Sequence, residues 1–276
     1  MLLADFIRSA SKSLEALYPG PEARSIALLL CQERLGVKSY THIVEPSREI
    51  DGAALEEDLG RLLSGEPLQY VLGSAPFCSR SFKVGAGVLI PRPETEQLVS
   101  IALGFASGMD SPRILDLCTG SGCIAWTLCL DIPGARVVGV DISEQALEVA
   151  RGQFEGPGPE FVCADIYLGP CTGGEVDILT ANPPYVMEKE RSQMRPNVLD
   201  YEPALALFVS DGDPLKPYRA ISRWASELLS ARGKAVVEIN EALGEQTAEV
   251  FREGGFRGVE LVRDLFGKPR FVTFGR

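Results

Sequence analysis

Predicted strands alternate with predicted helices from residue 112 to the end of the chain, and this alternation restricts the fold more than any other feature. Runs rich in Val, Ile and Leu predict the strands, and longer amphipathic segments predict the helices. The strands are predicted at 113–118, 136–141, 160–163, 176–181 and 235–240, and the helices at 123–130, 143–154, 217–229 and 244–253. Such alternation is typical of a parallel sheet with helices on both faces. We therefore predict an α/β fold for this part of the chain.

Two further strands are predicted after this series, at 259–262 and 270–274, with a short turn containing Gly267 between them. A connection this short cannot cross over the sheet as a parallel pair requires. We therefore predict that these two strands form an antiparallel pair at one edge of the sheet.

The first third of the chain has a different pattern. Apolar residues recur at helical spacing over much of residues 1–75, and Pro and Gly residues separate the segments. Residues 76–91 combine Phe and Val with Gly, which predicts a β-hairpin. We predict a helical domain over 1–75, a hairpin linker over 76–91 and an α/β domain over 92–276.

Composition excludes several classes of function. The chain has 276 residues and a formal net charge of −11, which argues against gripping a nucleic-acid backbone. It has one histidine, His42, and none of its seven cysteines forms a C-x-x-C pair, so we expect no metal site. The odd cysteine count indicates reduced thiols and a cytoplasmic protein. We expect neither a signal peptide nor a membrane span.

A glycine-rich loop follows the first predicted strand of the α/β part. It reads Asp116-Leu-Cys-Thr119-Gly120-Ser-Gly122 and opens a helix. Glycines permit positive φ and close approach of a ligand, and a helix N-terminus offers free N–H groups. Asp141 ends the next strand, where an acid can accept both ribose hydroxyls of an adenosine. The same residues also fit a nicotinamide dinucleotide fingerprint, or a tight turn with a capping acid.

Asp116 favours one of these ligands. A carboxylate just before the loop suits the cationic end of a ligand, an amino group or a sulfonium, and suits a pyrophosphate poorly. The predicted ligand is therefore S-adenosylmethionine rather than NAD. Asp165 follows the third strand, where it could face the adenine amino group or simply cap a loop or helix.

The segment Asn182-Pro183-Pro184-Tyr185 follows the fourth strand, at the edge where such sheets bind ligands. The two prolines stiffen the backbone and remove two N–H donors, which leaves mainly acceptors. A planar NH₂ group could donate both hydrogens to the Asn182 side chain and to the carbonyls of Asn182 and Pro183. Tyr185 could stack on that group. This arrangement suits methylation of an amide or exocyclic amine nitrogen; the alternative is a rigid loop without a role.

With these motifs together, the sequence resembles the release-factor glutamine N5-methyltransferases (PrmC/HemK) over nearly its whole length. The segments that carry the resemblance are 67–73, 82–84, 89–96, Asp116 to Gly122, Asp141, Asn182 to Tyr185 and Glu202-Pro203. The segment 89–96, Leu-Ile-Pro-Arg-Pro-Glu-Thr-Glu, and the Glu-Pro pair are more specific than Asn-Pro-Pro-Tyr, which adenine and cytosine amino-methyltransferases share.

The resemblance implies an N-terminal helical substrate-recognition domain, a β-hairpin linker and a Rossmann-like, seven-stranded class I methyltransferase domain. It implies methyl transfer from S-adenosylmethionine to the glutamine of the Gly-Gly-Gln motif in peptide chain release factors. We expect a monomer that acts on this protein substrate and binds neither nucleic acid nor membrane directly.

The predicted site residues follow from the motifs and the resemblance together. The catalytic residues are predicted to be Asn182, Pro183 and Tyr185. The cofactor-binding residues are predicted to be Asp116, Thr119, Gly120, Gly122, Asp141, Asp165 and Asn182. The substrate-binding residues are predicted to be Asn182, Pro183, Pro184 and Tyr185. The methylated nitrogen is strongly acidic, so no dedicated base is required, and His42 is predicted to be a surface or packing residue.

Residues outside the core motifs are also interpreted. Residues 186–200 are polar and aperiodic, which predicts a substrate-ordered lid or an ordinary surface loop. Glu202 is predicted to anchor the end of this segment, and Arg92 and Glu94 to tie the hairpin to the catalytic domain. Asn240 stands where many family members have glycine, and we expect this difference not to touch the chemistry.

Four alternatives to the release-factor enzyme remain open from sequence. The substrate could be a glutamine of a ribosomal protein, because the motifs barely separate the two. The chain could methylate adenine or cytosine in nucleic acid, although its charge argues against this. It could also be a non-enzymatic binding module of the same fold, or a nicotinamide-dependent dehydrogenase.

Overall fold

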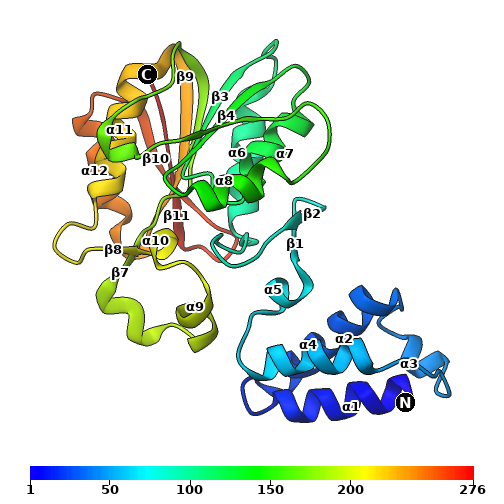
Figure 1. The fold of residues 1–276 in the computed structure, drawn as a ribbon. Coiled ribbons are helices and arrows are strands. Elements are labelled where there is room, and N and C mark those ends of the chain that lie inside the picture. Colours follow the sequence, from blue (N-terminus) through cyan, green and yellow to red (C-terminus); the bar gives the residue numbers. More distant parts are fainter. The chain divides into compact units, whose positions relative to one another are not determined.

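Amphipathic helices form the N-terminal part of the chain in the computed structural model, which describes residues 1–276 with the side chain of Ala54 excepted (Figure 1). These helices are α1 (Leu3–Leu14), α2 (Gly20–Leu35), α3 (Thr41–Val44), α4 (Ala53–Leu63) and α5 (Leu68–Leu72). Their apolar faces share one core that includes Phe6, Leu30 and Leu62. The helical character predicted for this region is confirmed, but α3 and α5 were too short for periodicity to reveal.

Contacts divide the chain into two units, each with its own core. The smaller unit is Met1–Ser74 with Arg195–Tyr201, and the larger is Ala75–Met194 with Glu202–Arg276. The short helix α9 (Pro196–Tyr201) therefore belongs to the smaller unit. There the Arg195 guanidinium pairs with Glu22 at 2.6 Å, and the Tyr201 hydroxyl donates to the Ser64 carbonyl at 2.9 Å.

The β-hairpin predicted at 76–91 is shorter than expected. It consists of β1 (Ser74–Phe77) and β2 (Arg80–Lys83), and the chain after β2 has no regular structure until α6 (Thr95–Ala106). Phe77 and Phe82 are buried in the core of the larger unit, with their rings 6.0 Å apart. The hairpin thus contributes to that core.

The larger unit is built on a seven-stranded sheet with strand order β10-β11-β9-β6-β3-β4-β5. The bounds are β3 (Arg113–Leu117), β4 (Arg136–Asp141), β5 (Glu160–Cys163), β6 (Val176–Ala181), β9 (Leu229–Glu238), β10 (Arg257–Arg263) and β11 (Pro269–Gly275). β3 to β6 and β9 pair in parallel, and β11 pairs antiparallel with both β9 and β10. The predicted parallel sheet and its antiparallel pair at one edge are confirmed.

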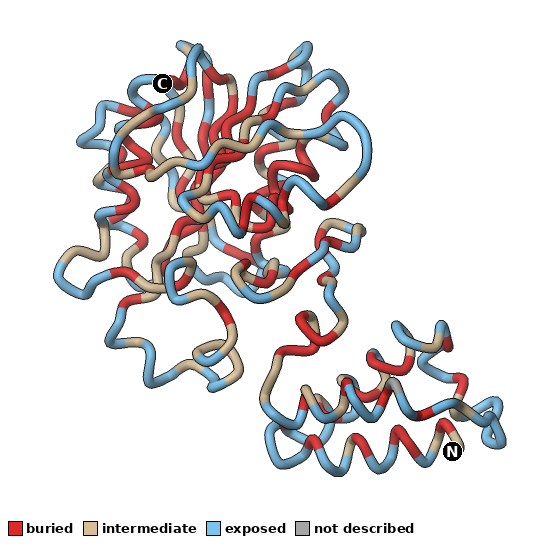
Figure 2. Tube along the Cα trace, in the orientation of Figure 1, coloured by how far each residue is buried: buried red, intermediate tan, exposed pale blue. Residues whose placement is uncertain are grey.

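Helices cover both faces of this sheet (Figure 1). One face packs against α6 and α7 (Cys123–Asp131), and the other against α11 (Lys216–Leu228) and α12 (Gly244–Glu253). Neighbouring residues of a strand point to opposite faces. On β3, Ile114 therefore joins the core under α6 and α7, whereas Leu115 joins the core under α11 and α12. The central strands β3 and β6 and the inner helix faces are largely buried, as Figure 2 shows, whereas the edge strands β5 and β10 are not.

Shorter elements connect the layers. They are α8 (Glu144–Arg151), η1 (Ile166–Leu168), β7 (Val186–Met187), η2 (Glu188–Gln193), α10 (Ala204–Leu207), β8 (Phe208–Val209) and η3 (Glu241–Leu243). The segment 186–200, predicted as a lid or a surface loop, contains β7, η2 and most of α9, so it has more regular structure than its composition suggested. None of the helices in the described part of the chain has the length and apolar character needed to cross a bilayer.

Candidate active site

The glycine-rich loop joins β3 to α7, and three of its residues have a left-handed backbone conformation. The φ angles are 58° at Cys118, 54° at Gly120 and 77° at Gly122, which caps α7. Glycine adopts such angles without steric cost, whereas a residue with a side chain is strained there. The loop therefore turns sharply and brings backbone N–H groups to the carboxyl edge of the sheet.

Asp116 lies beneath this loop. Its carboxylate is fully buried and accepts hydrogen bonds from the hydroxyls of Thr119 at 2.5 Å and Thr180 at 2.7 Å. Thr180 is its neighbour in the sheet, because β3 and β6 pair Asp116 with Thr180. Burial raises the pKa of Asp116 to about 7, although both hydroxyls favour the charged form. The carboxylate thus fixes the loop through Thr119 and is close to its titration point at neutral pH.

Asp141, the last residue of β4, is the second acid of the site. Its two carboxylate oxygens accept the backbone N–H groups of Gly120 at 2.8 Å and Ser143 at 2.9 Å. Burial raises its pKa. Each carboxylate oxygen has more than one acceptor position, so Asp141 can still accept two hydroxyl groups of a ligand. Its position and remaining acceptor capacity fit the diol of a ribose.

The Asn182–Tyr185 segment begins where β6 ends, as predicted. The Asn182 side-chain amide donates from Nδ2 to the Thr95 hydroxyl at 3.4 Å. Asn182 and Pro184 line a cavity, whereas Pro183 is buried and does not. Thr95, in the first turn of α6, is itself 2% exposed and lines the same cavity.

Tyr185 is directed toward the sheet. Its hydroxyl donates to Glu238 Oε1 at 3.0 Å, and its carbonyl accepts the Asn240 side-chain amide at 3.0 Å. Glu238, the last residue of β9, is 1% exposed and also accepts the Thr95 hydroxyl at 2.8 Å. Burial raises the pKa of both Tyr185 and Glu238. These contacts hold the segment rigidly against the ends of β6 and β9.

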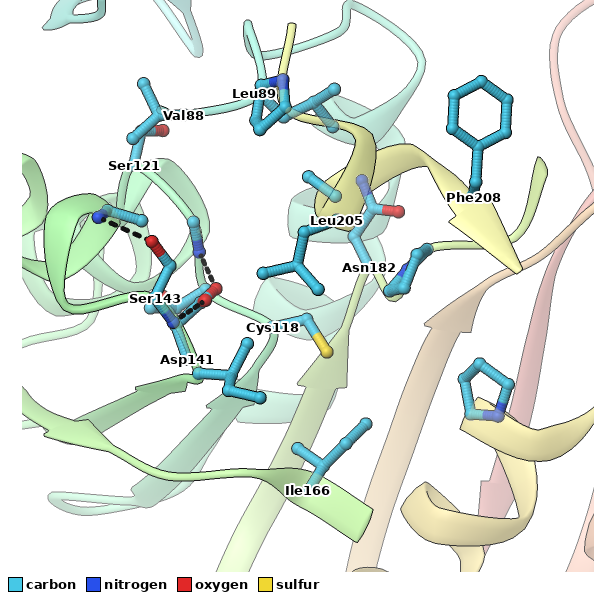
Figure 3. Close-up of a pocket in the computed structure, with 18 of the residues that line it drawn as sticks. Val88, Leu89, Cys118, Ser121, Asp141, Ser143, Ile166, Asn182, Leu205 and Phe208 are labelled. Carbon is cyan, nitrogen blue, oxygen red and sulfur yellow. Dashed lines mark hydrogen bonds between the residues drawn. The ribbon is translucent and has the colours of Figure 1, made fainter. Parts of the chain in front are cut away.

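The glycine loop, Asp141 and Asn182 line one cavity of about 350 Å³ (Figure 3). That volume lies within the range of small-molecule sites. Apolar side chains such as Val88, Leu205 and Ile166 make up much of its wall, together with a few polar groups (Figure 3). An apolar slot beside a carboxylate that can accept a diol fits an adenosine. The residues present therefore fit S-adenosylmethionine, with its adenosine held by the loop and Asp141.

Arg92 and Glu202 hold together the chain segments on one side of this cavity. Glu202 is 5% exposed and accepts from the Arg92 guanidinium at 2.6 Å and from the Ile90 N–H at 3.1 Å. Pro203 and Leu205, just after Glu202, line the cavity. The pair therefore fixes the start of residues 203–209 next to the chain around residue 90, a contact that the separate predictions for Arg92 and Glu202 did not include.

Comparison with known proteins places the chain in a family. A methyltransferase domain model matches residues 114–199, and a PrmC N-terminal domain model matches residues 5–73. A release factor glutamine methyltransferase of Bacteroides thetaiotaomicron is 41% identical over 273 residues, which cover 96% of this chain and 97% of that protein. The chain belongs to the release factor glutamine methyltransferase family. The family assignment predicted from the motifs is thereby confirmed, and with it the S-adenosylmethionine-dependent methyltransferase class.

Other relatives agree with this family. A release factor glutamine methyltransferase of Streptomyces coelicolor is 36% identical over 277 residues, 99% of this chain and 97% of that protein. Among solved structures, a ribosomal protein L11 methylase from Lactobacillus delbrueckii subsp. bulgaricus matches with a TM-score of 0.48 and 14% identity, covering 73% of this chain and 89% of that one. The fold assignment of this family member rests on its own strand order.

The predicted site residues of this methyltransferase fall into two groups. Those that line the cavity are Thr119, Gly120, Asp141, Asp165, Asn182 and Pro184. Those that lie behind its wall are Asp116, Gly122, Pro183 and Tyr185. The first group is placed for direct contact with a ligand. In the second group, Asp116 holds Thr119 of the first by a hydrogen bond. Direct ligand contacts by the members of the second group stay predictions.

Several residues of the site were missed or misjudged from the sequence. Thr95 lies in the segment 89–96 but was given no role there, and Glu238 belongs to none of the motifs, although a Glu at the end of a buried strand is an available signal. Glu96, not Glu94, ties the hairpin to α6, because Glu96 accepts the Cys78 N–H at 3.0 Å. Asn240, whose φ is −67°, donates its side-chain amide to the Tyr185 carbonyl. The expectation that its difference from glycine does not touch the chemistry stays a prediction.

Gly122 gives the first testable prediction. At its φ of 77°, an added Cβ would lie 3.0 Å from the Ala150 Cβ and 3.1 Å from Phe161 Cζ. We expect Gly122→Ala to lower the free energy of unfolding by about 1–3 kcal/mol, measured by urea denaturation. Gly104→Ala is the matched control, because Gly104 lies inside α6 with nothing within 4 Å of an added Cβ. The control should gain about 0.5–1 kcal/mol; equal effects of the two substitutions would contradict the packing argument.

Proposed function

We propose that this chain transfers the methyl group of S-adenosylmethionine to the side-chain amide nitrogen of the glutamine in the Gly-Gly-Gln motif of peptide chain release factors. The observation that carries the proposal is the placement of Asn182 on the wall of a cavity that fits the cofactor. The family membership and the names of its relatives support the same activity.

The acceptors of the Asn182–Tyr185 segment suit an amide substrate. An amide NH₂ group has two donors, and Asn182 supplies a side-chain oxygen and a backbone carbonyl as acceptors. The Pro183 carbonyl is the further acceptor that we assign to this task. Hydrogen bonds to these oxygens would hold the glutamine amide in place and strengthen as its nitrogen becomes positive.

Positioning supplies most of the rate in this mechanism. An amide nitrogen is a weak nucleophile because its lone pair is delocalised, and aligned reactants can contribute about 7–11 kcal/mol. The cofactor supplies a methyl group on a sulfonium, which is neutralised when the carbon–sulfur bond breaks and the nitrogen–carbon bond forms. The methylated nitrogen then releases a proton to water, so no side chain of this chain has to act as a base.

The buried acids suit the charge of this cofactor. Asp116 and Asp141 lie at the same edge of the sheet, and burial raises the pKa of both carboxyl groups. A cationic ligand favours their ionised forms. The same edge suits the pyrophosphate of a nicotinamide dinucleotide poorly, because that group is an anion.

The test is methylation of a purified release factor. The protein, labelled S-adenosylmethionine and the release factor are incubated together, and mass spectrometry locates the modified residue. We expect one methyl group on the glutamine of the Gly-Gly-Gln motif, and none when that glutamine is replaced by alanine. A ribosomal protein, RNA and DNA serve as parallel substrates. Preferred transfer to any of them, or label that persists after the Gln→Ala change, would overturn the proposal.

A further inference from the structure

Asn182 can accept a hydrogen bond from a substrate N–H in only one of the two orientations of its side-chain amide. The oxygen is an acceptor and the nitrogen is a donor, so only one orientation can accept a substrate N–H. A half-turn about the last side-chain bond exchanges the two at almost no steric cost. Something outside Asn182 must therefore choose between the orientations.

The Thr95 hydroxyl selects the orientation of the Asn182 amide, because it has only one proton to donate. Its hydroxyl donates to Glu238 Oε2 at 2.8 Å, so it can only accept from its other neighbour. That neighbour is the Asn182 side chain, whose Nδ2 lies 3.4 Å from the Thr95 oxygen. Among the described residues, none donates a hydrogen bond to Asn182 Oδ1. The oxygen is therefore left available to a ligand.

Glu238 determines that the Thr95 hydroxyl donates its proton away from Asn182. It is 1% exposed and accepts two hydroxyl protons, from Thr95 and from Tyr185 at 3.0 Å. A carboxylate accepts and does not donate, so both hydroxyls must point toward it. Burial raises the pKa of Glu238, and Glu94 acts in the same direction, whereas the two hydroxyls and the Arg270 guanidinium favour the ionised form.

We propose that Glu238 acts through Thr95 to hold the Asn182 amide with its nitrogen toward the protein and its oxygen free for the substrate. The proposal rests on the proposed function only for the identity of that substrate. Glu238 and Thr95 are then positioning residues, 143 residues apart in the sequence, that together determine which end of Asn182 the substrate meets.

The orientation can be measured without any substrate. The chain has three asparagines, Asn182, Asn197 and Asn240, so selective ¹⁵N labelling gives three side-chain amide pairs in an NMR spectrum. The pair that disappears in Asn182→Asp belongs to Asn182. We expect one of its two protons to be shifted downfield by the bond to Thr95, with the shift lost in Thr95→Val and kept in Thr95→Ser. An unchanged Asn182 pair in Thr95→Val would overturn the proposal.

Kinetics with a release factor provide the second test. We expect Thr95→Val to lower kcat about tenfold, with KM for cofactor and release factor unchanged, and Thr95→Ser to restore it. Glu238→Gln should lower kcat by itself but change it less than about twofold in the Thr95→Val background, because both substitutions act on one orientation. Additive effects, or a rise in KM for the cofactor without loss of kcat, would assign Thr95 a different role and overturn the proposal.

A matched control separates this effect from general loss of packing. Thr247 on α12 is fully buried, and its hydroxyl has no hydrogen-bond partner among the described groups. Thr247→Val should leave kcat and the Asn182 resonances unchanged, and equal losses in both valine variants would contradict the relay. If the unmodified protein does not methylate a release factor at all, the proposed function fails, while the NMR result still decides the proposal about Asn182.

Discussion

Asn182→Ala is expected to lower the rate of glutamine methylation about 10²–10³-fold, the loss typical of removing one preorganised polar group that stabilises developing charge. The substitution removes the side-chain acceptor on the cavity wall and keeps the backbone carbonyl. The amide would then bind in several orientations, few of which align its nitrogen for transfer. Single-turnover kinetics with saturating cofactor and release factor measure this effect directly.

Two controls isolate the cause of that loss. Cofactor affinity, measured by calorimetry, should change far less than the rate, because Asp141 and the glycine loop would still hold the adenosine. The thermal midpoint should fall little, since the hydrogen bond from Asn182 to Thr95 is long at 3.4 Å. A variant that methylates at an undiminished rate would remove Asn182 from the mechanism.

Much of the sheet could be predicted from short apolar runs in the sequence. The inner strands β4 and β6 are largely buried and match 136–141 and 176–181 in both bounds. The edge strand β5 matches 160–163 as well, although its residues are only partly buried or exposed. β9 was predicted to begin at 235, whereas it begins at Leu229. Its first residues, Leu-Ser-Ala-Arg-Gly-Lys, are mostly polar or small and lack the apolar run that marks the other strands.

The candidate site could be predicted where its residues stand at the carboxyl end of a strand. The glycine loop and Asn182 come immediately after strands of a parallel sheet and Asp141 is the last residue of another, so they meet at one edge. Thr95 and Glu238 could not be joined in this way. Their hydrogen bond depends on how the start of α6 docks over the end of β9, and no local pattern contains that information.

The sequence also did not reveal how deeply each acidic side chain of the site is buried. Asp116 and Asp141 were both predicted to contact the cofactor, yet only Asp141 lines the cavity. Asp116 lies one residue before the end of β3, where its side chain points to the sheet face under α6 and α7. A position one residue earlier on a strand is enough to move a carboxylate from the cavity wall to the interior.

That burial leads to the second large prediction, the effect of Asp116→Asn on stability as the pH changes. Burial moves the pKa of Asp116 from its ordinary 3.8 to about 7. A group whose pKa is raised in the folded state contributes stability at low pH that is lost as the pH rises through the folded value. The ligand-free protein should therefore lose about 3 kcal/mol from this one group between pH 5 and pH 8.

Asp116→Asn removes this loss, because the amide stays neutral and can still bond both hydroxyls, accepting from one threonine and donating to the other. We expect the difference in unfolding free energy between variant and unmodified protein to shift in favour of the variant by about 3 kcal/mol from pH 5 to pH 8, measured by urea denaturation. Asp110→Asn, at an exposed acid, should follow the unmodified protein at every pH. If the stability of Asp116→Asn and that of the unmodified protein change with pH in parallel, the buried carboxyl does not titrate in this range.

If the two pH–stability curves diverge as expected, the ionised carboxylate destabilises the ligand-free protein. A cationic cofactor then offsets that cost, so its affinity should rise between pH 6 and pH 8 in the unmodified protein and rise less in the variant, which keeps Asp141.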